Sequence, residues 1–179
     1  AAELETTRTR KAEIVHEAQA WIRFVEPRPY SILLTDRLRE ERQTERLKIG
    51  NGEAAAATLE QLIEENRKAL EQAEERIRQF NEQLEGKPDL AVAARLSWQR
   101  DLERLRSQVA AATATFLDLE RLIGQEVVAG SRVRLGLLQR QIVIADAGAK
   151  FIEADLEKVT AQIDRQSDQL ERELTAAQT

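Results

Sequence analysis

The sequence holds few side chains that could do acid–base or metal chemistry. His16 is its only histidine, and it closes the tetrapeptide EIVH at residues 13–16. That tetrapeptide has the Glu-x-x-His spacing of di-metal helical proteins, but such a site needs a second copy of the motif, which the sequence lacks. Cysteine is absent, so thiolate ligands and thiol nucleophiles are excluded. We therefore expect no metal and no cofactor, and we interpret His16 as an ordinary helix residue.

Paired carboxylates are a second candidate for metal ligation or proton transfer. Glu64 and Glu65 are adjacent, and Asp164 and Asp168 lie one helical turn apart. Basic residues are interleaved with these acids: Lys68, for example, follows Glu64 by four residues, which is the spacing of an ion pair along a helix. We interpret these pairs as solvated helix faces.

Nucleophilic catalysis and phosphate binding are not indicated either. The GKP at residues 86–88 lacks the upstream glycine and the following Ser or Thr of a phosphate-binding loop, so it is better interpreted as a turn. With one histidine, no cysteine and no glycine-framed serine, no nucleophile–base pair can be assembled. The sequence predicts a protein that is not an enzyme and has no catalytic residue; a metal-dependent four-helix enzyme is a distant alternative.

Composition favours long helices over a compact globule. Charged residues make up 33% of the 179 residues and aromatic residues 4%, with seven glycines and three prolines. Such a bias is typical of long helices and coiled coils. The net charge is −5, and the basic residues are interleaved with acids, so there is no basic face for nucleic acid. No apolar run reaches 18 residues, so we expect only indirect contact with a membrane.

Four breaks divide the chain. They are EPRPYS (26–31), GNGE (50–53), EGKPDL (85–90) and a softer region between Gly124 and Gly136. Prolines end helices, and glycines tolerate turn conformations. The breaks predict an all-α fold in a single domain, 1–179: an elongated antiparallel bundle or coiled coil of about five helices. Their expected bounds are 3–26, 31–49, 53–85, 89–124 and 131–178.

Apolar residues recur at alternating steps of four and three in three segments, which is the pattern of a coiled-coil seam. In the first segment the row is Leu59, Ile63, Asn66, Leu70, Ala73, Ile77, Phe80 and Leu84. In the second it is Trp98, Leu102, Leu105, Val109, Ala112, Phe116, Leu119 and Ile123. In the third it is Leu138, Ile142, Ala145, Ala149, Ile152, Leu156, Val159, Ile163, Gln166 and Leu170. The second and third rows differ in phase, which favours a reversal of the chain between residues 124 and 136 over one continuous kinked helix.

Two features within these rows predict helix packing. Asn66 places an amide in an apolar row, where it can fix register at some loss of stability. The stretch LLQRQIVIADAGAKFIEADLEKV (137–159) is narrowed by Ala145, Gly148 and Ala149. We expect a neighbouring backbone or a large side chain, such as Trp98 or Phe116, to approach closely there.

The segment RLGLLQRQIVIADAGAKFIEADLEKVTAQIDRQSDQLERELTAA (134–177) resembles the helical extramembrane region that precedes the membrane helices of larger MscS-like mechanosensitive channels. The features that carry the resemblance are the Leu-Leu-x-Arg-Gln run, the Ala-rich stretch and the acid-rich heptads. The 53–85 segment has a similar periodic pattern of residues. The pore-lining helix and the β-rich domain of that family are absent, so no functional residue carries over.

The resemblance implies a periplasmic ectodomain of an inner-membrane protein, with the membrane part after residue 179. Such a domain would support channel assembly or gating, and its partners would be its own membrane domain or other helical segments. Homo-oligomerisation stays open. The alternative is a coiled-coil adaptor or scaffold, like the helical hairpin of a membrane-fusion protein, with one unfilled seam that binds partner helices.

Overall fold

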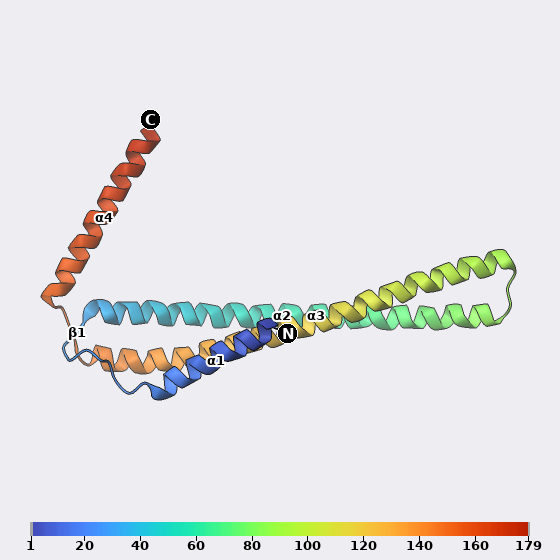
Figure 1. The fold of residues 1–179 in the computed structure, drawn as a ribbon, viewed down its shortest axis with the longest axis horizontal. Helices are drawn as coiled ribbons and strands as arrows, with labels where there is room; N and C mark the ends of the chain where they lie inside the picture. Colours follow the sequence, from blue (N-terminus) through green and yellow to red (C-terminus); the bar gives the residue numbers. More distant parts are fainter. Residues whose placement is uncertain (1, 179) are drawn as a thin grey trace. The chain divides into compact units, whose positions relative to one another are not determined.

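The computed structural model describes residues 2–178, and these form an all-α fold (Figure 1). Its elements in chain order are α1 (Ala2–Ala20), β1 (Tyr30–Ser31), α2 (Ile32–Glu85), α3 (Leu90–Asp146), β2 (Ala149–Lys150) and α4 (Glu153–Gln178). The chain divides into two compact units: residues 1–14 with 48–131, and residues 15–47 with 132–179. Helices α2 and α3 each continue from one unit into the other.

The described residues form four helices where five were expected, because two of the anticipated breaks are absent and one unexpected break follows Asp146. The GNGE segment lies inside α2, which is 54 residues long. Gly52 is needed there for close packing rather than for a turn: a Cβ on it would lie 2.4 Å from Cγ2 of Val128. No glycine in the described chain has a positive φ. The prediction of separate 31–49 and 53–85 helices is therefore wrong.

The expected reversal between Gly124 and Gly136 is also wrong, since α3 runs without interruption for 57 residues. A glycine inside a helix costs only about 1 kcal/mol relative to alanine, so it weakens a helix without ending it. Gly130 also has a packing role, because a Cβ on it would meet Lys11 and Ile14 of α1 at 3.6–3.9 Å. The phase change between the two apolar rows is a change of face along one helix.

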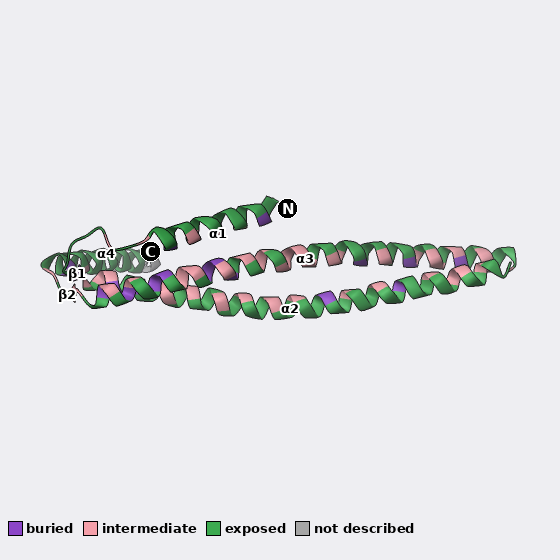
Figure 2. Cartoon of the chain, turned by 90° about the horizontal axis from the view of Figure 1, so that it is seen from below, coloured by how far each residue is buried: buried purple, intermediate pink, exposed green. Residues whose placement is uncertain are grey.

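In the first unit, residues 48–85 and 90–131 form an antiparallel helical hairpin. Contact partners run in opposite directions along the two helices: Asn66 bonds to Ala110, and Arg76 bonds to Glu103. The predicted α2 row from 59 to 84 is confirmed, since each of its members is buried or half-buried. Figure 2 shows exposed positions dominating the outer sides of the two helices.

The hairpin turns at EGKPDL, as the sequence predicts. Lys87 adopts a left-handed conformation, with φ of 51°, and its N–H donates to the Leu84 carbonyl at 3.2 Å. Asp89 caps α3, because the N–H of Val92 donates to its Oδ1 at 2.9 Å.

The second unit has a small core where α2 and α3 meet. Its buried members are Leu38, Leu138, Ile142 and Ala145, and Phe24 and Leu34 pack against them. Trp21, Phe24 and Tyr30 stack edge to face around the proline-containing loop, with ring centroids 5.4 and 5.1 Å apart. The aromatic cluster thus covers one end of this core.

The predicted 131–178 helix is wrong, because the chain is interrupted between Asp146 and Glu153. There β2 pairs in parallel with β1, so that Tyr30 lies opposite Ala149 and Ser31 opposite Lys150. The N–H of Tyr30 also donates to the carbonyl of Gly148 at 2.9 Å. The peptide groups freed at the end of α3 are thereby hydrogen-bonded to the loop before α2.

Candidate helix-docking surface

Five of the eight members of the apolar row predicted for residues 98–123 are exposed, and the other three are half-buried. Trp98, Leu105, Val109 and Phe116, all on α3 in the first unit, are 59–67% exposed. Trp98 and Phe116, which the sequence predicts as packing residues, are exposed in the described chain, so the predicted seam is only partly covered. We call the row from Trp98 to Ile123 the α3 outer row.

A different face of α3 packs against α2. Its buried members, Leu96, Glu103 and Ala110, recur every seven residues. At about 100° per residue, Leu105 lies roughly 160° around the helix from Glu103. The larger apolar residues of α3 are therefore not the ones buried against α2, although Leu105 and Val109 line an open groove together with α2 residues.

Polar groups make up much of the α2–α3 interface. The amide of Asn66 donates to the carbonyl of Ala110 at 2.6 Å, across the hairpin. Glu103 is buried, and its Oε1 accepts hydrogen bonds from Arg76 at 3.3 Å and from Arg106 at 2.5 Å. These contacts are directional, so they fix the register of the hairpin.

An open groove of about 540 Å³ runs beside these contacts, between α2 and α3. Asn66, Arg76 and Glu103 give it a polar floor, while Leu105 and Val109 give it an apolar edge. Because Leu105 and Val109 also belong to the α3 outer row, the groove and the row form one continuous surface. A helix lying on the row could place side chains into the groove.

The remaining candidates for chemistry lie apart. His16 is exposed on α1, and no three His, Asp or Glu side chains gather as metal ligands within the part of the chain that the structure describes. None of its helices is long and apolar enough to cross a membrane.

The predicted packing site at residues 145–149 takes a different form from the one expected. Ala145 is fully buried in the core of the second unit. A Cβ on Gly148 would lie 3.1 Å from the Tyr30 ring and 3.3 Å from Arg28, so these are the large side chains that approach, in place of Trp98 or Phe116. Ala149 lies in β2, opposite Tyr30. The small residues at 145–149 thus leave room for the loop that carries Arg28 and Tyr30.

The sequence does not predict the hydrogen bond between Ser31 and Asp155 that the structure shows. The hydroxyl of Ser31 caps α2 by accepting from the N–H of Leu33 at 3.1 Å, and it donates to Oδ1 of Asp155 at 2.5 Å. Oδ2 of Asp155 accepts from the N–H of Ile152 at 3.1 Å, which caps α4. Asp155 is fully buried. One carboxylate thus links the N-termini of two helices.

The hydrogen bond from Ser31, with smaller effects from the backbone N–H groups of Ile152 and Ile32, holds the pKa of Asp155 below its usual value; burial opposes this shift. The signal in the sequence was the spacing of Ile152 and Asp155, because an acid three residues after a helix N-cap can bond back to it. The helix ends predicted from the sequence rest on prolines and glycines, and this acid spacing is not among those signals.

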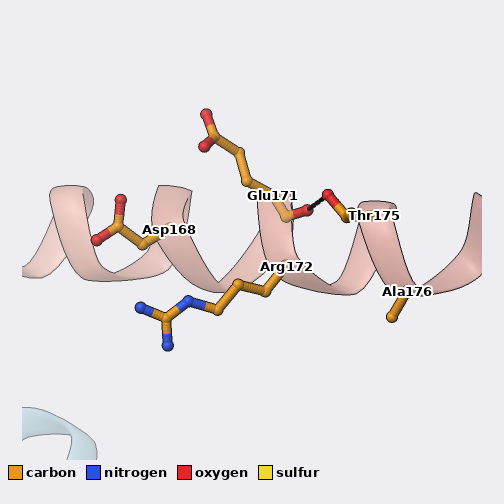
Figure 3. A pocket seen from close by; sticks show the side chains of 5 residues that line it. All are labelled: Asp168, Glu171, Arg172, Thr175 and Ala176. Atoms are coloured by element: carbon orange, nitrogen blue, oxygen red, sulfur yellow. Dashed lines mark hydrogen bonds between the residues drawn. The ribbon is translucent and has the colours of Figure 1, made fainter.

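A shallow surface on α4 does not form a site. It is lined by Asp168, Glu171, Arg172, Thr175 and Ala176, which are spread along one helix in Figure 3. The hydroxyl of Thr175 donates to the carbonyl of Glu171 at 2.8 Å, within the same helix. All the lining residues come from α4, so no second wall encloses a ligand.

Comparison of the chain with protein-family models, curated proteins and solved structures finds no match. Its function must therefore be argued from its own residues.

Proposed function

We propose that this chain is a non-enzymatic helical interaction module, and that its α3 outer row binds a helix from a partner segment. The observation that carries the proposal is the exposure of Trp98, Leu105, Val109 and Phe116 on α3. Large apolar side chains that gather in one exposed patch mark interaction surfaces.

The spacing of the row indicates what kind of partner fits. Steps of four and three place side chains as knobs and holes for a second helix, whereas a flat or irregular partner would use no such period. The groove beside Leu105 and Val109 offers space for the partner's side chains. A docked helix would extend the hairpin into the antiparallel bundle that the sequence predicts.

The setting we propose is the extramembrane region of an MscS-like mechanosensitive channel in the periplasm. The resemblance of residues 134–177 supports this setting, and so does a hairpin stiff enough to transmit force along two long helices. The docked helix would then belong to the channel's own polypeptide or to a neighbouring subunit, and docking would support assembly or gating. Membrane contact would remain indirect.

A second candidate is a coiled-coil adaptor or scaffold, like the hairpin of a membrane-fusion protein. The unfilled seam favours it, because an adaptor hairpin needs one seam free for another protein. The two settings differ in where the docked helix comes from: the same protein in a channel, and a different protein in an adaptor.

Cysteine protection tests the docking itself, since the chain has no cysteine of its own. Leu105→Cys would be compared with Ala111→Cys, an exposed position of α3 outside the row. In the purified chain both thiols should react readily with a maleimide. In the natural assembly Leu105→Cys should be protected while Ala111→Cys still reacts, because a docked helix excludes the reagent.

Equal reactivity of the two thiols in the assembly would refute the proposal. Where protection is found, a photoreactive crosslinker placed at Leu105→Cys separates the two settings. A product containing only this protein supports the channel setting, and a product containing a different protein supports the adaptor.

A further inference from the structure

A second apolar row lies exposed on α4. Every α4 residue from 160 to 176 is exposed. Leu156, Ile163, Leu170 and Leu174 are 56–65% exposed although they share one helix face. Val159 lies in the same row, with Gln166 as its polar member. The row advances by four and three residues up to Leu170 and then by four to Leu174. A regular step of three residues from Leu170 would fall on Glu173, which is charged, so the apolar row continues at Leu174 instead. Glu173 accepts a hydrogen bond from Gln169 at 2.8 Å.

The positions flanking this row carry no charge through its centre. They are Thr160, Gln162, Ser167 and Gln169. Flanking charges normally choose the partner of a coiled coil, by attracting opposite charges and repelling like ones. The charges here lie on the outer face instead, as acid–base neighbours such as Asp164 and Arg165. Uncharged flanks do not repel an identical helix and do not select an oppositely charged one.

Gln166 specifies orientation. In a parallel, in-register pair each seam position meets its own copy, so the amide of Gln166 would meet the amide of the other Gln166. An amide is both donor and acceptor, so the two can hydrogen-bond to each other. In an antiparallel pair Gln166 would face an apolar position such as Ile163 and lose its partner.

We propose that α4 is a dimerisation helix that pairs, parallel and in register, with α4 of a second copy of this chain. The row from Leu156 to Leu174 covers nearly three heptads of the 26-residue helix α4, close to the length at which such pairing becomes stable. The inference is separate from the proposed function, because it uses the α4 row and leaves the α3 outer row free for another helix.

Analytical ultracentrifugation of the full chain, over a range of concentrations, tests the pairing. The wild type should show a reversible monomer–dimer equilibrium. Ile163→Glu should raise its dissociation constant by about 100-fold or more, because it buries two like charges in the seam. Ala161→Glu adds the same charge on the outer face and should leave the equilibrium within about threefold of the wild type. Far-UV circular dichroism would check that both variants keep their helices.

Disulfide trapping tests the orientation. In a parallel pair Gln166→Cys should form a covalent dimer readily, because facing seam positions lie within the Cα separation that a disulfide allows. Asp168→Cys, on the outer face, should not. Covalent dimers formed only between Val159→Cys and Leu170→Cys chains would show antiparallel pairing, in the register that places Gln166 opposite Ile163, and would overturn the proposal.

Leu105→Glu separates this inference from the α3 outer row. The variant should dimerise like the wild type. A monomeric wild type, equal effects of Ile163→Glu and Ala161→Glu, or a dimer lost on Leu105→Glu would each refute pairing through α4.

Discussion

Replacing Gly52 with alanine should destabilise the hairpin, although the same change two residues earlier should stabilise it. Both glycines lie inside α2, where alanine is the better helix former. A Cβ at position 50 meets nothing within 4 Å, whereas a Cβ at position 52 would lie 2.4 Å from Cγ2 of Val128. The two variants therefore separate intrinsic helix propensity from packing.

The magnitudes follow from two opposing effects. Gly50→Ala should raise the free energy of unfolding by about 0.5–1 kcal/mol, through backbone entropy and helix propensity. Gly52→Ala gains the same amount but overpacks the interface at a loss of about 1–3 kcal/mol. Val128 cannot easily rotate away, because a β-branched side chain in a helix has one strongly preferred rotamer. The net change for Gly52→Ala should lie between about zero and a loss of about 2.5 kcal/mol.

Urea and thermal denaturation of the full chain, followed by circular dichroism, would measure both variants. In a chain of this size, 1 kcal/mol corresponds to a Tm shift of about 2–4 °C. Val128→Ala added to Gly52→Ala should recover about 1–2 kcal/mol relative to the sum of the single changes, because the smaller side chain makes room for the new methyl group. If Gly52→Ala were as stabilising as Gly50→Ala, the close approach of α2 to α3 at this point would be refuted.

Three further predictions concern the second unit. Ala145→Leu should lower the free energy of unfolding by about 1–3 kcal/mol in urea denaturation, because the site is fully buried; a neutral effect would contradict tight packing there. Thr35→Val should be neutral or stabilise by up to about 1 kcal/mol in the same assay, since the Thr35 hydroxyl is buried without a hydrogen-bond partner among the described residues; a clear loss would reveal a partner. The lowered pKa of Asp155 means that its contribution to stability is complete above the unfolded pKa, about 3.9, and is lost as pH falls through the folded value. Wild type and Asp155→Asn should therefore differ at neutral pH and converge in acid, as followed by Tm from pH 7 to pH 2; a constant difference would contradict this linkage.

The sequence predicted those parts of the hairpin in which local pattern and packing agree. The α2 row from residues 59 to 84 is buried or half-buried along its length, and the turn at EGKPDL forms with Asp89 as the cap. In both places periodicity or turn chemistry acts over a few residues and has few competitors.

Glycines were misleading because the same residue serves two purposes. Gly52 and Gly130 indicated turns, yet both are helical residues at which another helix comes close. Sequence alone does not separate a turn from a close approach, because both require the absence of a side chain. The break after Asp146 has no local signal of this kind in the sequence. It depends on pairing between β1 and β2, which are distant in the sequence, and on the Ser31–Asp155 contact.

The face that α3 turns toward α2 is where the sequence prediction and the structure differ most informatively. Its residues offer two faces to α2: a row of large apolar side chains, and a row in which Leu96 and Ala110 alternate with Glu103. Burial of apolar area alone would choose the first, at about 25 cal/mol per Å². The hairpin uses the second, held by the Asn66–Ala110 hydrogen bond and by the two arginines around Glu103. An interface of this kind specifies register and leaves the large apolar side chains of α3 exposed. Such an arrangement is expected of a helix pair that is one part of a larger helical assembly.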